Sequence, residues 1–64
     1  MKTYQQRVVE ECTELQLRTK RLAEFITSSP VYLTLPPAEK ERLAIQHDLM
    51  EKLILILRER IAAF

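Results

Sequence analysis

The chain has 64 residues, with 10 Lys and Arg, 9 Asp and Glu, one His, one Cys and no Gly. A chain of this length buries only about 60% of its unfolded surface, so it usually needs a disulfide, a metal or partner subunits. The single cysteine excludes an intrachain disulfide, the near-neutral charge argues against a protein that coats duplex nucleic acid, and the lack of Gly excludes the usual phosphate-binding loops.

The first predicted element is a helix over about residues 3–27, a stretch without Pro or Gly in which good helix formers dominate. Counting by sevens gives one mainly apolar row, which consists of Met1, Val8, Leu15 and Leu22. The adjoining row consists of Tyr4, Glu11, Arg18 and Phe25. We expect these two rows to form the inward face of an amphipathic helix, bordered by the row that contains Gln5, Cys12, Thr19 and Ile26.

A break follows at residues 28–36, where the sequence reads SSPVYLTLP. Ser29 before Pro30 is a typical N-cap with proline in the first helical position, which predicts one short helical turn over 30–34. The apolar residues of this stretch are expected to close the end of a hairpin; they are Val31, Tyr32, Leu33 and Leu35.

The second long helix is predicted over about residues 37–62, with Pro37 in its first position and Glu39 and Glu41 in its first turns. Its expected inward face contains Leu43, Gln46, Met50, Leu53, Leu57 and Phe64, with Arg60 in the same row. Two long helices with a short connection predict an all-α, antiparallel two-helix hairpin that forms one domain over 1–64.

Residues 53–57 read LILIL, five consecutive apolar side chains that go more than once around a helix axis. One partner helix buries a single stripe, so the remaining apolar residues predict association into a helical-bundle homo-oligomer, a dimer or a higher assembly; a hexamer is what the resemblance described below implies. The expected interface residues are Leu49, Leu53, Ile54, Ile56, Leu57 and Ile61.

Several polar side chains are candidates for binding a ligand. Glu11 and Arg18 lie in the expected inward row, where they either pair across a subunit interface or line a polar cavity. Arg18, Lys20 and Arg21 fall within one helical turn, which is either a solvated face or a compact site for phosphate oxygens. Tyr4, with Arg7 nearby, is either a first core residue or an aromatic ring that stacks on a nucleobase.

The same sequence offers little for catalysis. His47 has no Ser or Cys placed to form a triad with it, and it is expected to be a packing residue. Neither a metal site nor another cofactor is expected, because the carboxylates, His47 and Cys12 do not form a familiar ligand set. The longest apolar run is shorter than the ~20 residues that span a bilayer, and no secretory signal opens the chain, so we expect a cytoplasmic protein.

The stretches YQQRVVEECTELQLRTKRLAEFI and ERLAIQHDLMEKLILILRERIAAF resemble a family of small phage-encoded helical hairpins named after a crAssphage gene product. The architecture also resembles the phage sponges that oppose CBASS and Thoeris defence. Those proteins assemble into oligomers and hold cyclic nucleotide signals between subunits without cleaving them. The resemblance implies a non-catalytic homo-oligomer, with Tyr4 as the stacking aromatic and Arg18, Lys20 or Arg21 as the phosphate contact.

This resemblance implies a cytoplasmic phage-type binding protein that sequesters a small anionic nucleotide, either a cyclic oligonucleotide or a relative of cyclic ADP-ribose. Its expected ligand-binding residues are Tyr4, Arg7, Glu11, Arg18, Lys20 and Arg21. The alternative is a structural or adaptor protein whose apolar second helix binds a host or phage protein.

Overall fold

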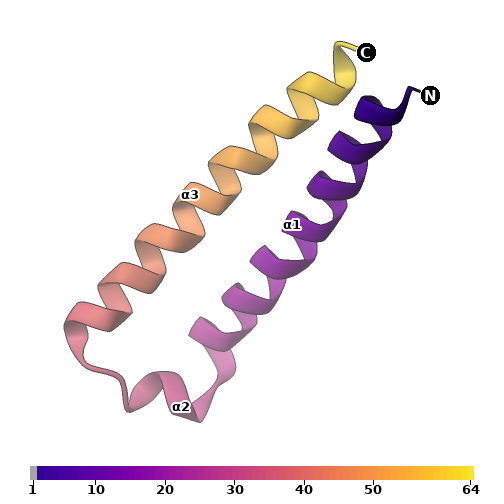
Figure 1. The fold of residues 1–64 in the computed structure, drawn as a ribbon. Coiled ribbons are helices and arrows are strands. Elements are labelled where there is room, and N and C mark those ends of the chain that lie inside the picture. The colour runs from indigo at the N-terminus through magenta and orange to yellow at the C-terminus, as the bar shows by residue number, and fades with distance from the viewer. Residues whose placement is uncertain (1) are drawn as a thin grey trace.

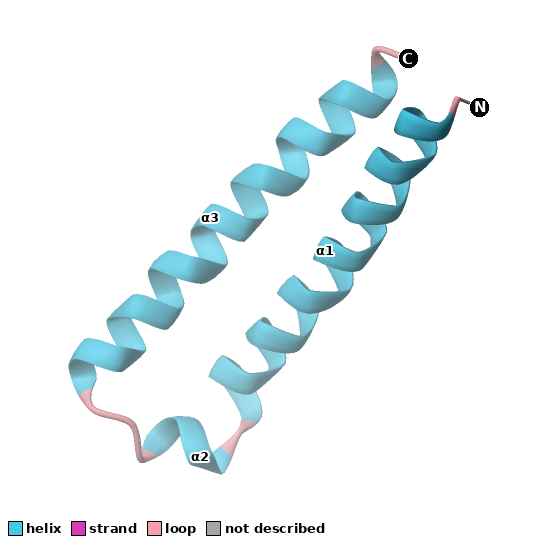
Figure 2. Cartoon of the chain, in the orientation of Figure 1, coloured by secondary structure: helices cyan, strands magenta, loops and turns pink. Residues whose placement is uncertain are grey.

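The computed structural model describes residues 2–64, and Met1 of the predicted apolar row lies outside them. Two long helices, α1 (Thr3–Ser28) and α3 (Pro37–Ala62), run antiparallel, and the short helix α2 (Pro30–Leu33) connects them (Figure 1). The molecule is a rod of 45 × 16 × 13 Å. Both termini lie at its open end, opposite the connection (Figures 1 and 2). The predicted all-α hairpin with a helical turn in its connection is confirmed.

The ends of the helices follow from local chemistry. The Ser29 hydroxyl accepts a hydrogen bond from the Val31 amide at 3.2 Å, and Pro30 occupies the first helical position of α2. In α3, Pro37 begins the helix, Glu39 lies in the first turn and Arg60 in the last turn. These charges complement the helix macrodipole at the two ends.

The core is a narrow stripe between α1 and α3. Its center consists of Val8, Cys12 and Leu57, with Leu15 and Ile61 packed against them. Leu57 is 1% exposed, the lowest value among the buried apolar side chains. Thr19 is also buried, and its hydroxyl donates to the Leu15 carbonyl oxygen at 2.7 Å, so its polar group is satisfied within the helix.

The prediction of the inward face of α1 was wrong in one of its two rows: the row that contains Cys12 is buried in place of the row that contains Glu11. Cys12 and Thr19 are buried against α3, whereas Tyr4, Glu11 and Arg18 are exposed. Both rows border the apolar row that contains Val8 and Leu15, so counting by sevens does not choose between them. Burial costs little for a small thiol or an internally bonded hydroxyl, but much for a carboxylate and a guanidinium.

The inward face of α3 also differs from the expected one. Ile54 is buried and His47 half-buried, whereas Gln46 and Leu53 are exposed. The stripe that packs on α1 contains Leu43, His47, Met50, Ile54, Leu57 and Ile61. Its spacing of three and four residues keeps one helical face toward the partner helix.

Only part of the connection closes the hairpin. The Tyr32 ring packs edge-on against Phe25, with 6.1 Å between ring centroids, and the Lys40 ammonium lies 5.3 Å from the center of the Tyr32 ring. Val31 and Leu33 are exposed. A four-residue helix has too little surface to turn all its apolar side chains toward the long helices, so Tyr32 is half-buried in α2, and Leu35 is half-buried just after it.

Candidate ligand-binding grooves

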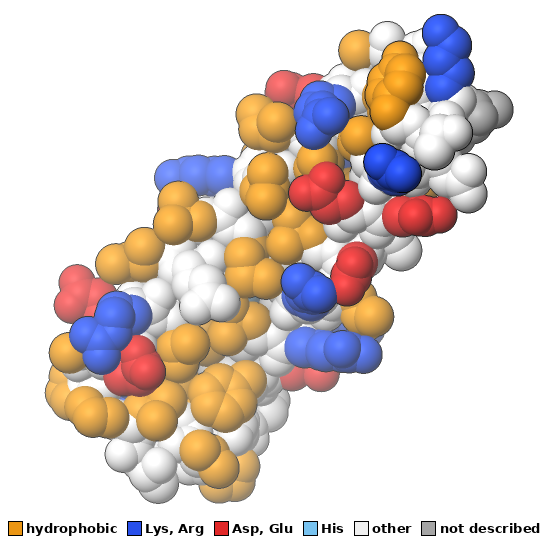
Figure 3. Space-filling model, viewed as in Figure 1, with side chains coloured by type: hydrophobic (Ala, Val, Ile, Leu, Met, Phe, Trp, Pro, Cys, Tyr) orange, Lys and Arg blue, Asp and Glu red, His pale blue; other side chains and the backbone are white. Residues whose placement is uncertain are grey.

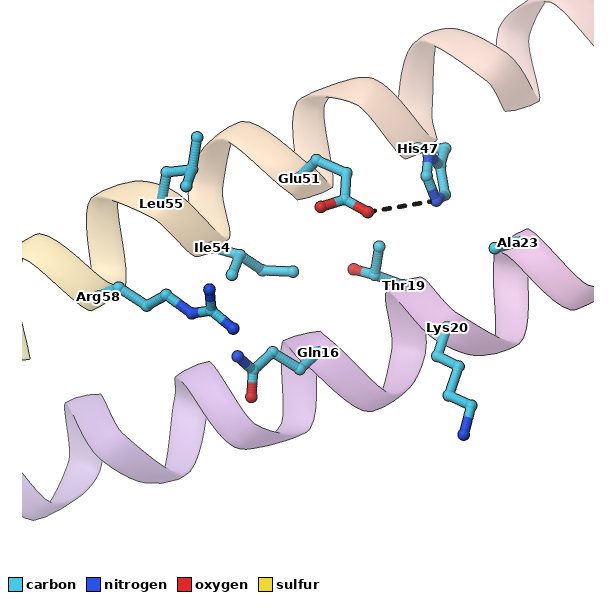
Figure 4. A pocket seen from close by; sticks show the side chains of 9 residues that line it. All are labelled: Gln16, Thr19, Lys20, Ala23, His47, Glu51, Ile54, Leu55 and Arg58. Carbon is cyan, nitrogen blue, oxygen red and sulfur yellow. Dashed lines mark ion pairs between the residues drawn. The ribbon is translucent and has the colours of Figure 1, made fainter.

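A polar groove lies along one flank of the hairpin, with a volume of about 430 Å³ (Figure 4). Helix α1 contributes Gln16, Thr19, Lys20 and Ala23, and α3 contributes His47, Glu51, Ile54, Leu55 and Arg58. Buried Thr19 and Ile54 form its floor, and longer polar side chains stand around them. The small side chains of Thr19 and Ala23 leave the space that a larger residue would fill.

Two polar contacts give the groove its chemical character. The Arg58 side chain extends from α3 toward Gln16 of α1 (Figure 4). With the Gln16 amide oxygen turned toward Arg58, this oxygen accepts hydrogen bonds from the guanidinium at 2.8 and 3.2 Å. At the other end, His47 Nε2 lies 3.6 Å from Glu51 Oε1, one helical turn along α3. The groove therefore has a guanidinium at one end and an imidazole–carboxylate pair at the other.

A smaller groove of about 210 Å³ lies on the opposite flank and is called here the Arg18 groove. It is lined by Glu11, Glu14, Leu15, Arg18 and Leu53. The Arg18 guanidinium pairs with the Glu14 carboxylate at 2.6 Å, and both side chains are largely exposed. An exposed pair of this kind contributes only about 0.3–0.5 kcal/mol, so a ligand anion can compete for Arg18 at small cost.

A third groove, of about 370 Å³, runs along the outer side of α3 and is called here the apolar groove. It is lined by Arg42, Ile45, Gln46, Leu49, Met50 and Leu53. Ile45, Leu49 and Leu53 are between 44% and 58% exposed, and Ile56 continues the same helical face at 52%. Hydrophobic side chains extend along the face of the molecule seen in Figure 3. The four residues Ile45, Leu49, Leu53 and Ile56 are called here the α3 stripe.

The structure separates the predicted ligand-binding residues into different places. Glu11 and Arg18 meet in the Arg18 groove, and Lys20 lies at the rim of the polar groove. Tyr4 is exposed at the open end, where its ring packs edge-on against Phe64 with 6.2 Å between centroids. Arg7 and Arg21 are also exposed and line none of the three grooves. Within a single chain, Lys20 and Arg18 therefore lie in different grooves.

The predicted interface residues also divide into two groups. Leu49, Leu53 and Ile56 are exposed and available to a partner. Ile54 and Leu57 are buried within the hairpin, and Ile61 packs against its core, so these three side chains lie inward rather than on the outer surface. This is a correction, and it follows from the shifted inward face of α3.

Sequence reasoning missed four residues of the polar groove, which are Gln16, His47, Glu51 and Arg58. Gln16 and Arg58 each stand at the edge of an apolar stripe, a position that looks like an ordinary solvated boundary in sequence. Aligning the two predicted helices antiparallel could have revealed these residues, because that alignment brings Gln16 of α1 close to Arg58 of α3. His47 does pack at the hairpin interface, but it also lines the groove.

Some kinds of site are absent from residues 2–64. No three or more His, Cys, Asp or Glu side chains in this range are grouped to hold a metal ion. No helix in the same range has both the length and the apolar content to cross a bilayer.

The fold and its grooves define a small helical hairpin with exposed surfaces suited to binding. Residues 2–63 match the model of the Sequestin family, and the chain belongs to that family. No curated protein and no solved structure matches it significantly. The resemblance to a family of small helical hairpins is thereby confirmed, and the family name suggests a sequestering, non-catalytic role.

Proposed function

We propose that the protein is a phage-type, non-catalytic sponge that sequesters a cyclic nucleotide immune signal in pockets between subunits. Its ligand would be a cyclic oligonucleotide or a relative of cyclic ADP-ribose, held in the cytoplasm of an infected bacterium. The family name supports the sequestering role. The position of Leu53 carries the part of the proposal that concerns intersubunit pockets.

Leu53 lines both the apolar groove and the Arg18 groove, so the two surfaces are continuous. A second copy packed on the α3 stripe would cover its exposed apolar side chains, and the same copy would form a wall over the Arg18 groove. A two-fold arrangement would repeat this on both copies, since each contributes the same patch. Assembly would therefore turn a shallow groove into an enclosed pocket.

Tyr4, Glu11 and Arg18 lie in one exposed row of α1, and the chemistry of this row matches a nucleotide. Arg18 and, toward the open end, Arg7 are cations suited to phosphate oxygens. Tyr4 presents an exposed ring that can stack on a base. Glu11 can accept a hydrogen bond from a base amine or a ribose hydroxyl. Lys20 lies on the other flank of α1. The proposal therefore assigns the phosphate to Arg18 with Arg7 or Arg21, of which Arg21 is one helical turn from Arg18.

The test combines oligomeric mass with ligand recovery. The mass of the native oligomer is first measured by native mass spectrometry. The purified protein is then screened by thermal shift against cyclic di- and trinucleotides and cyclic ADP-ribose isomers. A ligand that binds only the folded state raises its stability by mass action. Heating the complex and identifying the released ligand by chromatography separates sequestration from turnover. A defined oligomer, a stabilising ligand and its intact release would support the proposal, whereas a monomer that no nucleotide stabilises would overturn it.

A second candidate function rests on the exposure of the α3 stripe. An apolar stripe on one helix is also the surface with which a helix docks in the groove of another protein, so the chain could act as an adaptor for a host or phage protein. The two functions differ in native mass. A sticky monomer or dimer that becomes ordered with a protein partner favours the adaptor, and a defined higher oligomer favours the sponge.

A further inference from the structure

The polar groove is complete within one chain, unlike the proposed intersubunit pocket. It lies on the flank of the hairpin opposite the Arg18 groove, because the buried row that contains Cys12 and Thr19 separates the two. A second copy packed on the α3 stripe would leave this flank open. Whatever the groove binds is therefore independent of assembly.

Arg58 provides an available cation at one end. Within residues 2–64, no carboxylate lies within 4.0 Å of its guanidinium, and its partner is the neutral amide of Gln16. Because the partner is neutral, no carboxylate offsets the charge of this guanidinium, and an incoming anion does not have to displace one. The planar guanidinium also matches the oxygens of a phosphate. The Gln16 amide can turn by half a rotation and donate its NH₂ to the same phosphate. Lys20 adds positive charge at the rim, although its side chain points away from α3 (Figure 4).

The other end of the groove favours hydrogen-bond donors and disfavours anions. Arg58 and Glu51 are seven residues apart, which is about 10 Å along a helix. The Glu51 carboxylate, close to His47, accepts hydrogen bonds from hydroxyl or amino groups and repels a second phosphate. The groove thus favours a ligand with negative charge at one end and hydrogen-bond donors at the other.

Apolar surface lies between these two ends. Ile54 forms part of the floor, and Leu55, which is 57% exposed, stands at the side. These side chains can contact the flat faces of a sugar or a base. The volume of about 430 Å³ falls in the range of about 300–1,000 Å³ that small-molecule sites occupy.

We propose that the polar groove is a second ligand site, which binds a nucleoside monophosphate within a single chain. The phosphate lies against Arg58 and Gln16, the body of the ligand lies on Ile54 and Leu55, and its hydroxyl or amino groups reach Glu51. This site goes beyond the proposed sequestration in the intersubunit pocket and does not depend on it.

The test uses ¹⁵N-labelled full-length protein, titrated separately with adenosine 5′-monophosphate, adenosine and inorganic phosphate. The monophosphate is expected to shift the signals of Gln16, Glu51 and Arg58, and to bind at least about tenfold more tightly than either fragment. Ile56→Glu, which disrupts the α3 stripe, is expected to keep this binding. Shifts confined to the Arg18 groove, or no saturable shift at all, would overturn the proposal. So would equal affinity for the monophosphate and inorganic phosphate, since the body of the ligand would then contribute nothing.

Two substitutions separate the ends of the site. Arg58→Gln is expected to weaken monophosphate binding at least about tenfold, whereas the control Arg42→Gln, on the same helix outside the groove, leaves it unchanged. Glu51→Gln is expected to improve binding of adenosine 3′,5′-bisphosphate relative to the monophosphate, because the second phosphate of that ligand is on the ribose, toward the Glu51 end of the groove, and the substitution removes a repelling charge there. Unchanged affinity in Arg58→Gln, with helical content retained by circular dichroism, would also contradict the proposal.

Discussion

Leu53 of α3 and Arg18 of α1 line the same groove, and Leu53 also lines the apolar groove on the outer side of α3. A partner that covers the apolar side of Leu53 therefore approaches the guanidinium of Arg18. This relationship couples self-association to ligand binding in the proposed function. It also means that a substitution in the α3 stripe can remove binding without touching the ligand.

Ile56→Glu tests the coupling. Ile56 is 52% exposed in the single chain, so the substitution leaves the hairpin core intact. In an assembly it would bury an unpaired carboxylate, which costs about 3–5 kcal/mol and weakens association more than about a hundredfold. Native mass spectrometry is expected to show dissociation into smaller species, and thermal shift to show loss of cyclic nucleotide binding.

Leu55→Glu is the matched control for that experiment. Leu55 is the preceding residue and is similarly exposed, but it lines the polar groove on the other flank. Its native mass should equal that of the unmodified protein. If Ile56→Glu also keeps the original mass, the α3 stripe is not the interface.

Arg18→Glu and Lys20→Glu are expected to differ, although the two residues are close in sequence. Arg18 lines the groove next to the α3 stripe, and Lys20 lies at the rim of the polar groove. Reversing the charge of Arg18 places a carboxylate beside the proposed phosphate and should abolish cyclic nucleotide binding by isothermal titration calorimetry. The Kd of Lys20→Glu for the cyclic nucleotide should stay within about threefold of that of the unmodified protein, a difference of less than about 0.7 kcal/mol in binding free energy. Equal loss in both variants would instead indicate a site that spans the outer surface of α1.

Tyr4→Leu tests the proposed stacking on a nucleobase. Replacing an aromatic ring with an aliphatic side chain of moderate size removes base stacking, which is worth about 1–3 kcal/mol, or about five- to 150-fold in Kd. Tyr32→Leu is the control, because the ring of Tyr32 packs against Phe25 at the closed end of the hairpin. The cyclic nucleotide affinity of Tyr32→Leu should stay unchanged. An unaltered affinity in Tyr4→Leu would remove that ring from the site.

The helices were predictable from sequence because their signals are local. Proline at positions 30 and 37, the Ser29 cap and the long stretches without Pro or Gly determine where each helix begins and ends. The rotation of each helix was not predictable in the same way. Glu11 and Cys12 are neighbours in sequence, and a rotation of one residue decides which of them faces the other helix.

The grooves were even less accessible to sequence reasoning. The Arg58–Gln16 contact joins residues that are far apart in the chain, and it depends on the antiparallel alignment of α1 and α3. Arg18 and Lys20 looked like one cationic cluster because they are two residues apart. On a helix such residues point in directions that differ by about 160°, so they line grooves on opposite flanks.

Leu57→Ala tests how much of the stability depends on the narrow core. Leu57 is 1% exposed and belongs to the central cluster with Val8 and Cys12. Removing its buried methyl and methylene groups is expected to cost about 2–5 kcal/mol, which is a large part of the stability available to a domain of this size. Since about 1 kcal/mol moves the melting temperature of a small domain by about 4–8 °C, this variant should melt at least about 8 °C lower.

The matched control for this variant is Leu55→Ala, the same chemical change at an exposed position of α3, where about 0.5 kcal/mol or less is expected. Both variants are melted at one protein concentration, because association would make the melting temperature depend on concentration. If the two variants melt alike, Leu57 is not the centre of the core. If Leu57→Ala alone loses its cooperative transition, the contact between α1 and α3 at this residue holds the hairpin together, and both flanking grooves depend on it.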